Sequence, residues 1–174
     1  MSPIPTTTIM VLSVGDTIPS GEFQTIEYSP ELDSLEVCGM PSKVSTDSWK
    51  GKKIVLVAFT PTCTANHIPP FLEKIDQLKS KGVDQVYVIA SNDVFVMSAF
   101  VRALKTSDKI AGLADSTLTW LDKAGLSQDL SAVGFGKRAA RFAAVIDDLK
   151  VTYVGIEQGK GVEVSGVDAV LAKL

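Results

Sequence analysis

The sequence KIVLVAFTPTCTANHIPPFLEKIDQLKSKGVDQVYVIAS, residues 53–91, decides the fold. Its two ends, 53–59 and 85–91, are short apolar runs of the kind that form buried strands. Between them, apolar side chains recur with the spacing of an amphipathic helix, which is predicted to end near Lys81 and Gly82. The apolar positions of this helix are Phe71, Leu72, Ile75 and Leu78. A strand, a helix and a second strand form a right-handed crossover, which requires the two strands to be parallel.

The neighbouring segments extend this unit on both sides. Upstream, residues 15–21 are rich in turn formers, the alternation in 23–28 predicts an early strand, and a polar loop follows. Downstream, Ser91-Asn92-Asp93 can cap a second helix. The predicted inner face of that helix consists of Val96, Ala99, Phe100, Ala103 and Leu104.

The last third of the chain completes an α/β pattern. Residues 118–124 predict a third helix, and 167–174 predict a final one. Between them, 139–146 and 151–156 are two apolar runs joined by a short turn, which predicts an antiparallel hairpin. This order of elements predicts an α/β fold, a thioredoxin-like three-layer sandwich with a mixed central sheet.

The composition is that of one soluble globular domain. The chain has 174 residues, of which 45% are hydrophobic and 21% charged. We expect residues 1–13 to form an N-terminal extension and residues 14–174 to form a single thioredoxin-like domain. The formal net charge of -3 and the lack of a basic patch argue against a nucleic-acid-binding surface.

Neither a secretion signal nor a membrane span is predicted. Residues 1–15 contain no Lys or Arg, and the apolar stretch 9–12 is too short for the core of a signal peptide. Residues 54–72 are largely apolar, but prolines and polar residues interrupt them. The final residues Ala172-Lys173-Leu174 are close to the Ser-Lys-Leu peroxisomal signal, so the expected location is peroxisomal or cytoplasmic.

Cys63 is the strongest candidate for a chemical role. It lies where the first apolar run ends and the helix begins, and the unpaired N–H groups at a helix start favour a thiolate over a thiol. Thr60, three residues earlier, offers a hydroxyl that could hydrogen-bond to a substrate oxygen. The alternative is a small buried apolar residue without reactivity, which is a common role for a free cysteine. With only Cys38 in addition, a disulfide-stapled scaffold is not expected.

Residues 59–69, Phe-Thr-Pro-Thr-Cys-Thr-x-x-His-x-Pro, resemble the peroxidatic loop of the peroxiredoxins, in particular the atypical type II group with its fungal peroxisomal and allergen-type members. The resemblance covers residues 14–174 and implies thiol-dependent reduction of hydrogen peroxide and alkyl hydroperoxides without a cofactor. Further segments that are similar to the same group, in the same order, are 81–86, 91–97, 129–134 and 140–143.

The resemblance also implies roles for individual residues. Cys63 as a thiolate would attack the peroxide and become a sulfenic acid. Thr60 and Arg141 would orient the thiolate and the peroxide, and Arg138 is the second candidate for that arginine. Read without the resemblance, the favoured interpretation of Arg141 is a solvated or salt-bridged residue at a strand end. The secondary members of the implied pocket are Pro61, His67 and Arg138.

The other cysteine, Cys38, precedes Cys63 by 25 residues. The resemblance implies that it resolves the sulfenic acid as a disulfide, with the partner chain of a homodimer favoured, and that thioredoxin or glutaredoxin reduces the bridge. The alternative is an inert loop thiol. His67 lies four residues after Cys63, but two ligands make a weak metal site, so no metal is expected.

The chain departs from the family pattern directly before the loop. The family motif is P-G-A-F-T-P-x-C, whereas here Leu56 and Val57 precede Ala58-Phe59, and about four residues of the usual strand are absent. A catalytically weakened redox sensor or holdase on the same scaffold is therefore an alternative function. A thioredoxin-type disulfide reductase is disfavoured because the chain has no Cys-x-x-Cys pair.

Overall fold

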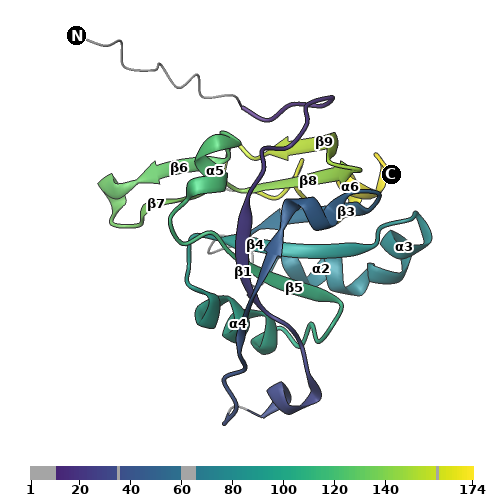
Figure 1. The fold of residues 1–174 in the computed structure, drawn as a ribbon. Coiled ribbons are helices and arrows are strands. Elements are labelled where there is room, and N and C mark those ends of the chain that lie inside the picture. Colours follow the sequence, from purple (N-terminus) through teal and green to yellow (C-terminus); the bar gives the residue numbers. More distant parts are fainter. Residues whose placement is uncertain (1–10, 35, 60–65, 160) are drawn as a thin grey trace.

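The computed structural model describes residues 11–34, 36–59, 66–159 and 161–174. In this part of the chain the main sheet has seven strands in the order β2-β1-β5-β4-β3-β8-β9 (Figure 1). The strands are β1 (Glu22–Ile26), β2 (Pro41–Ser45), β3 (Lys53–Ala58), β4 (Gln85–Ala90), β5 (Ile110–Ala114), β8 (Phe142–Asp147) and β9 (Lys150–Ile156).

The strand directions make the sheet mixed. β3 pairs with β4 in parallel and β4 pairs with β5 in parallel, which confirms the crossover predicted from residues 53–91. β3 pairs antiparallel with β8, and β8 and β9 form the predicted antiparallel hairpin. All residues of β3 after Lys53 are buried, because the strand lies between β4 and β8 and both of its faces are covered.

Helices cover the two faces of the sheet and produce three layers. On one face, Val55 and Val57 of β3 belong to a core shared with α2, α3, α4 and α6. On the other face, Ile54 and Leu56 belong to a core shared with Trp49 and the helix α5. The predicted α/β three-layer architecture is confirmed. The helices are α2 (Ile68–Glu73), α3 (Ile75–Ser80), α4 (Val94–Ala103), α5 (Thr119–Lys123), α6 (Val167–Leu171) and the short 3-10 turns η1 (Pro30–Asp33), η2 (Thr46–Trp49) and η3 (Ser131–Val133).

The predicted inner face of α4 is wrong at three of its five positions, since Phe100 and Leu104 are partly buried and pack against the core. Val96, Ala99 and Ala103 are exposed, whereas the buried residues of this helix are Val94, Met97 and Ser98. The Asp93 carboxylate accepts hydrogen bonds from the amides of the second and third helical residues, which fixes the helix start and therefore the direction of each side chain. The stripe that faces the sheet consequently begins with the first residue after the cap.

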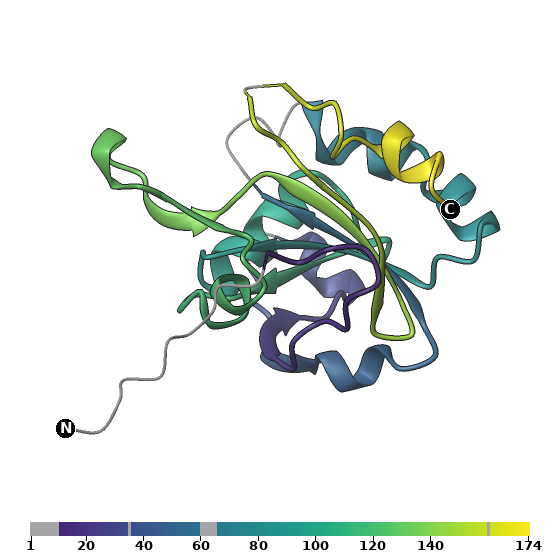
Figure 2. The ribbon, with the colours of Figure 1, turned by 90° about the horizontal axis from the view of Figure 1, so that it is seen from above.

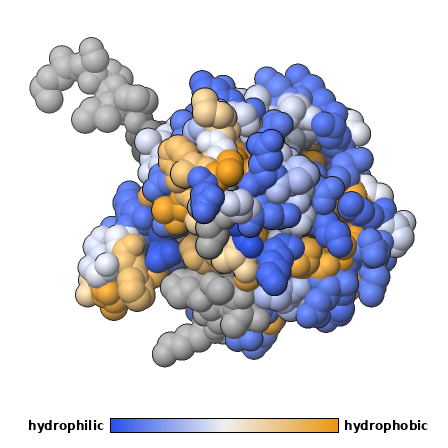
Figure 3. Space-filling view, turned by 90° about the horizontal axis from the view of Figure 1, so that it is seen from below, coloured by the Kyte–Doolittle hydropathy of each residue, from blue (hydrophilic) through white to orange (hydrophobic). Residues whose placement is uncertain are grey.

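The strand predicted over residues 139–146 is divided in two. Ala139 ends β7 (Gly136–Ala139), which pairs with β6 (Ser127–Leu130) in a separate two-stranded sheet, and Phe142 begins β8. The β6–β7 hairpin projects from the body of the molecule (Figures 1 and 2). Its tip exposes the apolar side chains of Val133 and Phe135, and the hairpin is the lobe at the left of Figure 3.

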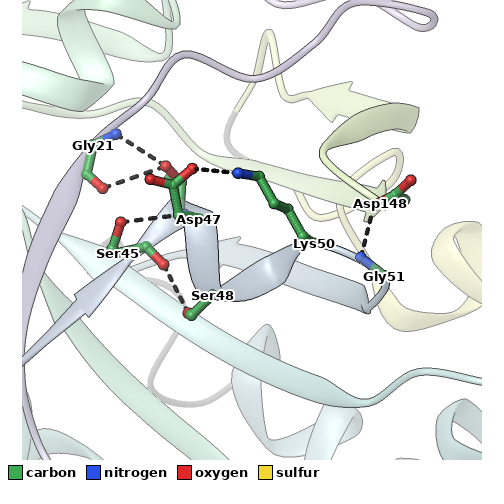
Figure 4. Close-up of polar contacts among 8 residues, drawn as sticks. Gly21, Ser45, Asp47, Ser48, Lys50, Gly51 and Asp148 are labelled. Carbon is green, nitrogen blue, oxygen red and sulfur yellow. Dashed lines mark hydrogen bonds and ion pairs between the residues drawn. The ribbon is translucent and has the colours of Figure 1, made fainter.

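The turn that precedes β3 is fastened on two sides (Figure 4). The Thr46 hydroxyl accepts a hydrogen bond from the Gly21 amide at 3.0 Å, beside β1. The Gly51 amide donates to the Asp148 carboxylate at 2.6 Å, in the turn between β8 and β9. Within the turn, the Ser45 side chain caps η2. The first bond connects η2 to the start of β1, and the second connects Gly51, which precedes β3, to the β8–β9 hairpin. The start of β3 therefore has a fixed position in the sheet.

Candidate active site

Three of the predicted site residues, Thr60, Pro61 and Cys63, lie outside the described residues. The structure describes the residues on either side of them. At the end of β3, the Phe59 amide donates to the Ile89 carbonyl at 2.9 Å, and the Phe59 ring packs against Phe100 with centroids 4.1 Å apart. The segment with the candidate cysteine therefore leaves from the carboxyl end of a central strand, as the sequence predicts.

His67 lies just beyond this segment, at the start of α2, and is fully buried. Its Nε2 is 2.7 Å from the carbonyl oxygen of Ser165, and its ring meets Phe71 edge to face with centroids 5.8 Å apart. Because a carbonyl can only accept, Nε2 must carry the hydrogen of this bond. His67 thus connects α2 to the segment before α6, and Figure 2 shows α6 beside α2 and α3.

His67 should make the stability of the protein depend on pH. Burial lowers the pKa of His67 below its ordinary value of 6.5, the hydrogen bond with Ser165 opposes this, and the nearby positive charge of Arg141 lowers the pKa further. The unfolded chain then binds the proton more readily than the folded one. As the pH falls below about 6.5, the free energy of unfolding should decrease by up to about 1.4 kcal/mol per pH unit, until the lower folded pKa is reached.

Urea unfolding at several pH values between 5 and 7.5 measures this slope. His67 is the only histidine of the chain, so a His67→Asn variant should lose the slope in this window while being less stable throughout. An equally steep slope in the variant would show that another group is responsible.

Arg141 lies in the break between β7 and β8 and is partly exposed. Its Nη1 donates to the carbonyl oxygen of Gly161 at 2.7 Å, and its own carbonyl accepts from the Glu157 amide at 2.9 Å. Arg141 and His67 therefore bond to the same segment, residues 157–165, from two different elements.

Arg138 has a different environment. It lies on β7, opposite Gln128 of β6, and its guanidinium carbon is 5.9 Å from the centre of the Phe135 ring. Its Nε is buried and has no hydrogen-bond partner among the described residues. Arg138 thus belongs to the projecting hairpin, whereas the bonds of Arg141 join it to the segment that contacts His67.

The described start of α2 supplies few amide donors. Pro69 and Pro70 are its second and third residues, and a proline carries no N–H group. An anion near this helix start would therefore depend strongly on a positively charged side chain. Arg141 is the described cation bonded to the same network.

Cys38 is exposed and unpaired. It lies between β1 and β2, whose pairing places Ile26 opposite Pro41. Because β1 runs antiparallel to β5, the connection between β1 and β2 lies at the end of the sheet where strands β4 and β5 begin. Strand β3 ends at Ala58, at the opposite end of the sheet.

A cavity of about 590 Å³ lies at the same end of the sheet as Cys38. Its lining includes Tyr28, Arg102 and Ile110, and none of its lining residues is a predicted site residue.

No group of three or more potential metal ligands occurs among residues 11–34, 36–59, 66–159 and 161–174. In the same part of the chain, no helix combines the length and apolar character that crossing a bilayer requires.

The sequence did not single out the segment that joins His67 to Arg141. Glu157, Gly161 and Ser165 hold its main contacts. A signal was present, because a carboxylate directly follows the apolar strand and opens a short stretch with two glycines. Polar residues in a loop at a strand end are frequent members of functional sites.

Comparison with known proteins identifies the family. The Redoxin family profile matches residues 13–171. A Malassezia furfur protein named "Putative peroxiredoxin" is 47% identical over 166 residues, which are 92% of this chain and 99% of that protein. A Lipomyces kononenkoae protein named "Putative peroxisomal peroxiredoxin" is 46% identical over 159 residues, which are 88% of this chain and 95% of that protein.

Among solved structures, reduced Prx3 from Vibrio vulnificus in complex with H2O2 has a TM-score of 0.79 and 32% identity, and the match covers 93% of this chain and 95% of that one. This likeness confirms the thioredoxin-like fold predicted from the order of elements. The family match spans nearly all of the described fold, including the break at Arg141 and the segment bonded to His67. The chain therefore belongs to the peroxiredoxins, the thiol peroxidases of the redoxin family.

Proposed function

We propose that this chain reduces hydrogen peroxide and alkyl hydroperoxides at Cys63, with Arg141 as the cation that stabilises the thiolate. The observation that carries the proposal is that Arg141 and His67 both bond to residues 157–165, while His67 lies two residues beyond the segment 60–65 that contains Cys63. A guanidinium keeps its charge at every physiological pH, so it can stabilise an anion throughout a reaction cycle.

The proposed first step is a displacement at oxygen. The Cys63 thiolate attacks one peroxide oxygen, a sulfur–oxygen bond forms, and the oxygen–oxygen bond breaks. The second oxygen leaves with the bonding electron pair and takes up a proton, as water from hydrogen peroxide or as an alcohol from an alkyl hydroperoxide. Cys63 is thereby oxidised to a sulfenic acid and the peroxide is reduced. Arg141 and the Thr60 hydroxyl would stabilise the departing oxygen, and Pro61 would line the pocket.

The second step is assigned to Cys38. Its sulfur would attack the sulfenic acid, forming a disulfide and releasing water, and thioredoxin or glutaredoxin would reduce that disulfide by thiol exchange. The β1–β2 connection and the end of β3 lie at opposite ends of the strands, about 17 Å apart along the strand direction and about 14 Å apart across the strands. A disulfide requires α-carbons within about 7 Å, so this separation supports a bridge between two chains.

A Cys38→Ser variant should stall after its first turnover. With thioredoxin and about two equivalents of peroxide per chain, it should consume the first equivalent in a fast burst and the second only slowly, because nothing resolves the sulfenic acid and only its further oxidation to a sulfinic acid consumes more peroxide. The measurement is the burst of peroxide loss, followed by trapping of the sulfenic acid at Cys63 with a 1,3-diketone and mass spectrometry. Unimpaired steady-state turnover with thioredoxin would remove the resolving role from Cys38.

The proposed assembly is a homodimer in which the projecting β6–β7 hairpin takes part. Val133 and Phe135 at its tip are 63% and 57% exposed, and exposed apolar side chains on a projecting element are typical of contact surfaces. We further propose that residues 14–174 act as one domain with residues 1–13 as an extension, although Leu12 is buried and its amide donates to Ala124 at 2.9 Å.

The proposed location is the peroxisome, with the cytoplasm as the alternative. The C-terminal Ala172-Lys173-Leu174 supports it, together with the name of the Lipomyces kononenkoae relative.

A further inference from the structure

The carboxylate of Glu157 forms the centre of the hydrogen bonds around the candidate site. A single oxygen, Oε1, accepts from the Glu163 amide at 2.6 Å, from the Ser165 amide at 2.7 Å and from the Ser165 hydroxyl at 2.8 Å. These donors come from the far end of the segment that Glu157 itself begins. The carboxylate therefore holds Glu163 and Ser165 close to Glu157, directly after β9, and we refer to this part of the chain as the 157–165 loop.

We propose that Glu157 is a positioning residue for peroxide reduction, which orients Arg141 and His67 by holding the 157–165 loop in shape. The proposal rests on the function proposed above. Arg141 contacts this loop through the Gly161 carbonyl, and His67 contacts it through the Ser165 carbonyl. Glu157 touches neither the thiol nor the peroxide in this account, and it acts through the two carbonyls.

The path from Glu157 to each of the two side chains is short. Ser165 is fully buried and uses its amide and hydroxyl on Glu157, while its carbonyl accepts from His67. On the other side, the Glu157 amide donates to the Arg141 carbonyl, so the backbone of Arg141 and the end of its side chain both bond to this loop. A shift of the loop would therefore move the Arg141 guanidinium and the His67 ring together.

The carboxylate is ionised at neutral pH. Burial alone would raise the pKa of Glu157, but the hydrogen bonds from Ser165, Glu163 and Val164 together outweigh it and lower the pKa below its ordinary value of 4.5. Hydrogen bonds to an ionised acceptor are roughly twice as strong as those between neutral groups. A neutral amide at this position would keep the shape of the side chain and weaken all three bonds.

A second tether keeps the loop attached when Glu157 is changed. The Tyr153 hydroxyl donates to the Val164 carbonyl at 2.5 Å. Gly155 lets this carbonyl approach β9 closely, since a β-carbon there would lie only 2.1 Å from the Val164 oxygen. Loss of the carboxylate should therefore change the conformation of the loop without detaching it from the sheet or unfolding the domain.

The test uses Glu157→Gln and Glu157→Ala in a Cys38→Ser background, so that only the first, reductant-independent oxidation is observed. Stopped-flow mixing with hydrogen peroxide gives the second-order rate constant for loss of the Cys63 thiol. We expect a fall of about 100-fold for Glu157→Ala, the scale of a misplacement of about 1 Å, and a smaller fall for Glu157→Gln. Glu163→Gln is the matched control, because its side chain is exposed and only its backbone amide bonds to Glu157.

A second readout separates positioning from general destabilisation. The pH profile of Cys63 alkylation by iodoacetamide should move to higher pH in both Glu157 variants, because the cation that favours the thiolate is displaced. Urea unfolding at the same pH identifies the fraction folded. A folded Glu157→Ala chain with the rate constant and alkylation profile of the parent would overturn the inference. A parent chain that does not lose its thiol on mixing with peroxide would instead overturn the proposed function itself.

Discussion

Replacing Cys63 by Ser should lower the rate of peroxide reduction by at least about 10⁴-fold, the scale of losses on removing a reacting nucleophile. The attacking species is a thiolate, and a serine hydroxyl is essentially never ionised at neutral pH and cannot form a sulfenic acid. Peroxide consumption with thioredoxin or glutaredoxin as the reductant measures the loss. Because serine is close to cysteine in size, the variant should fold and unfold like the parent protein.

Cys38→Ser is the matched control for the first burst of peroxide loss, measured without a reductant, since it removes the other cysteine of the chain and should keep the first oxidation. Retention of more than a few per cent of the activity in Cys63→Ser would mean that the chemistry takes place elsewhere in the chain.

Replacing Arg141 by Ala should lower the second-order rate constant with hydrogen peroxide by about 10²- to 10³-fold, the usual scale for losing one group that stabilises a developing oxyanion. The loss has two causes. The thiolate would lose its nearby positive charge, and the departing oxygen would lose a donor. Arg141→Lys should recover only part of the rate, because an ammonium group cannot donate to the Gly161 carbonyl and to a bound peroxide from one rigid plane.

Arg138→Ala provides the comparison, because it removes the same side chain three residues away on the projecting hairpin. We expect a change of less than about threefold in the rate constant, because Arg138 is half-buried in the projecting hairpin beside Phe135 and its described contacts do not include the 157–165 segment. A larger loss in Arg138→Ala than in Arg141→Ala would reverse the assignment of the two arginines.

The elements that the sequence predicted well are those whose own residues carry a strong pattern. β3 and β4 are continuous apolar runs because both of their faces are buried, and Asp93 marks the start of α4 because its carboxylate caps the helix. β5 was missed although it is a central strand. Its sequence is short and rich in small residues, so it lacks a strong apolar pattern. Gly112 must be small because it lies against the α4 backbone, where a β-carbon would be 3.2 Å from the Met97 carbonyl oxygen.

The candidate site shows the same division between local and long-range information. Cys63, His67 and Arg141 were predicted from the motif and its resemblance, and the structure joins the latter two through one loop. The loop itself could not be predicted, because the bond from His67 to Ser165 spans 98 positions of sequence. No local sequence pattern indicates which backbone carbonyl a buried histidine ring will contact. The division of the predicted strand at Arg141 likewise follows from the pairing of β7 with β6.

The most direct test of the account is the titration of the Cys63 thiol in the Cys38→Ser chain, followed by its rate of alkylation and its rate of reaction with hydrogen peroxide across pH 4 to 10. We predict a thiol pKa at least about one unit below the 8.5 of free cysteine, with rapid oxidation by peroxide over the same pH range in which the thiolate exists. A thiol that titrates near 8.5 and reacts with peroxide no faster than free cysteine would contradict it, and would favour the weakened redox sensor on the same scaffold.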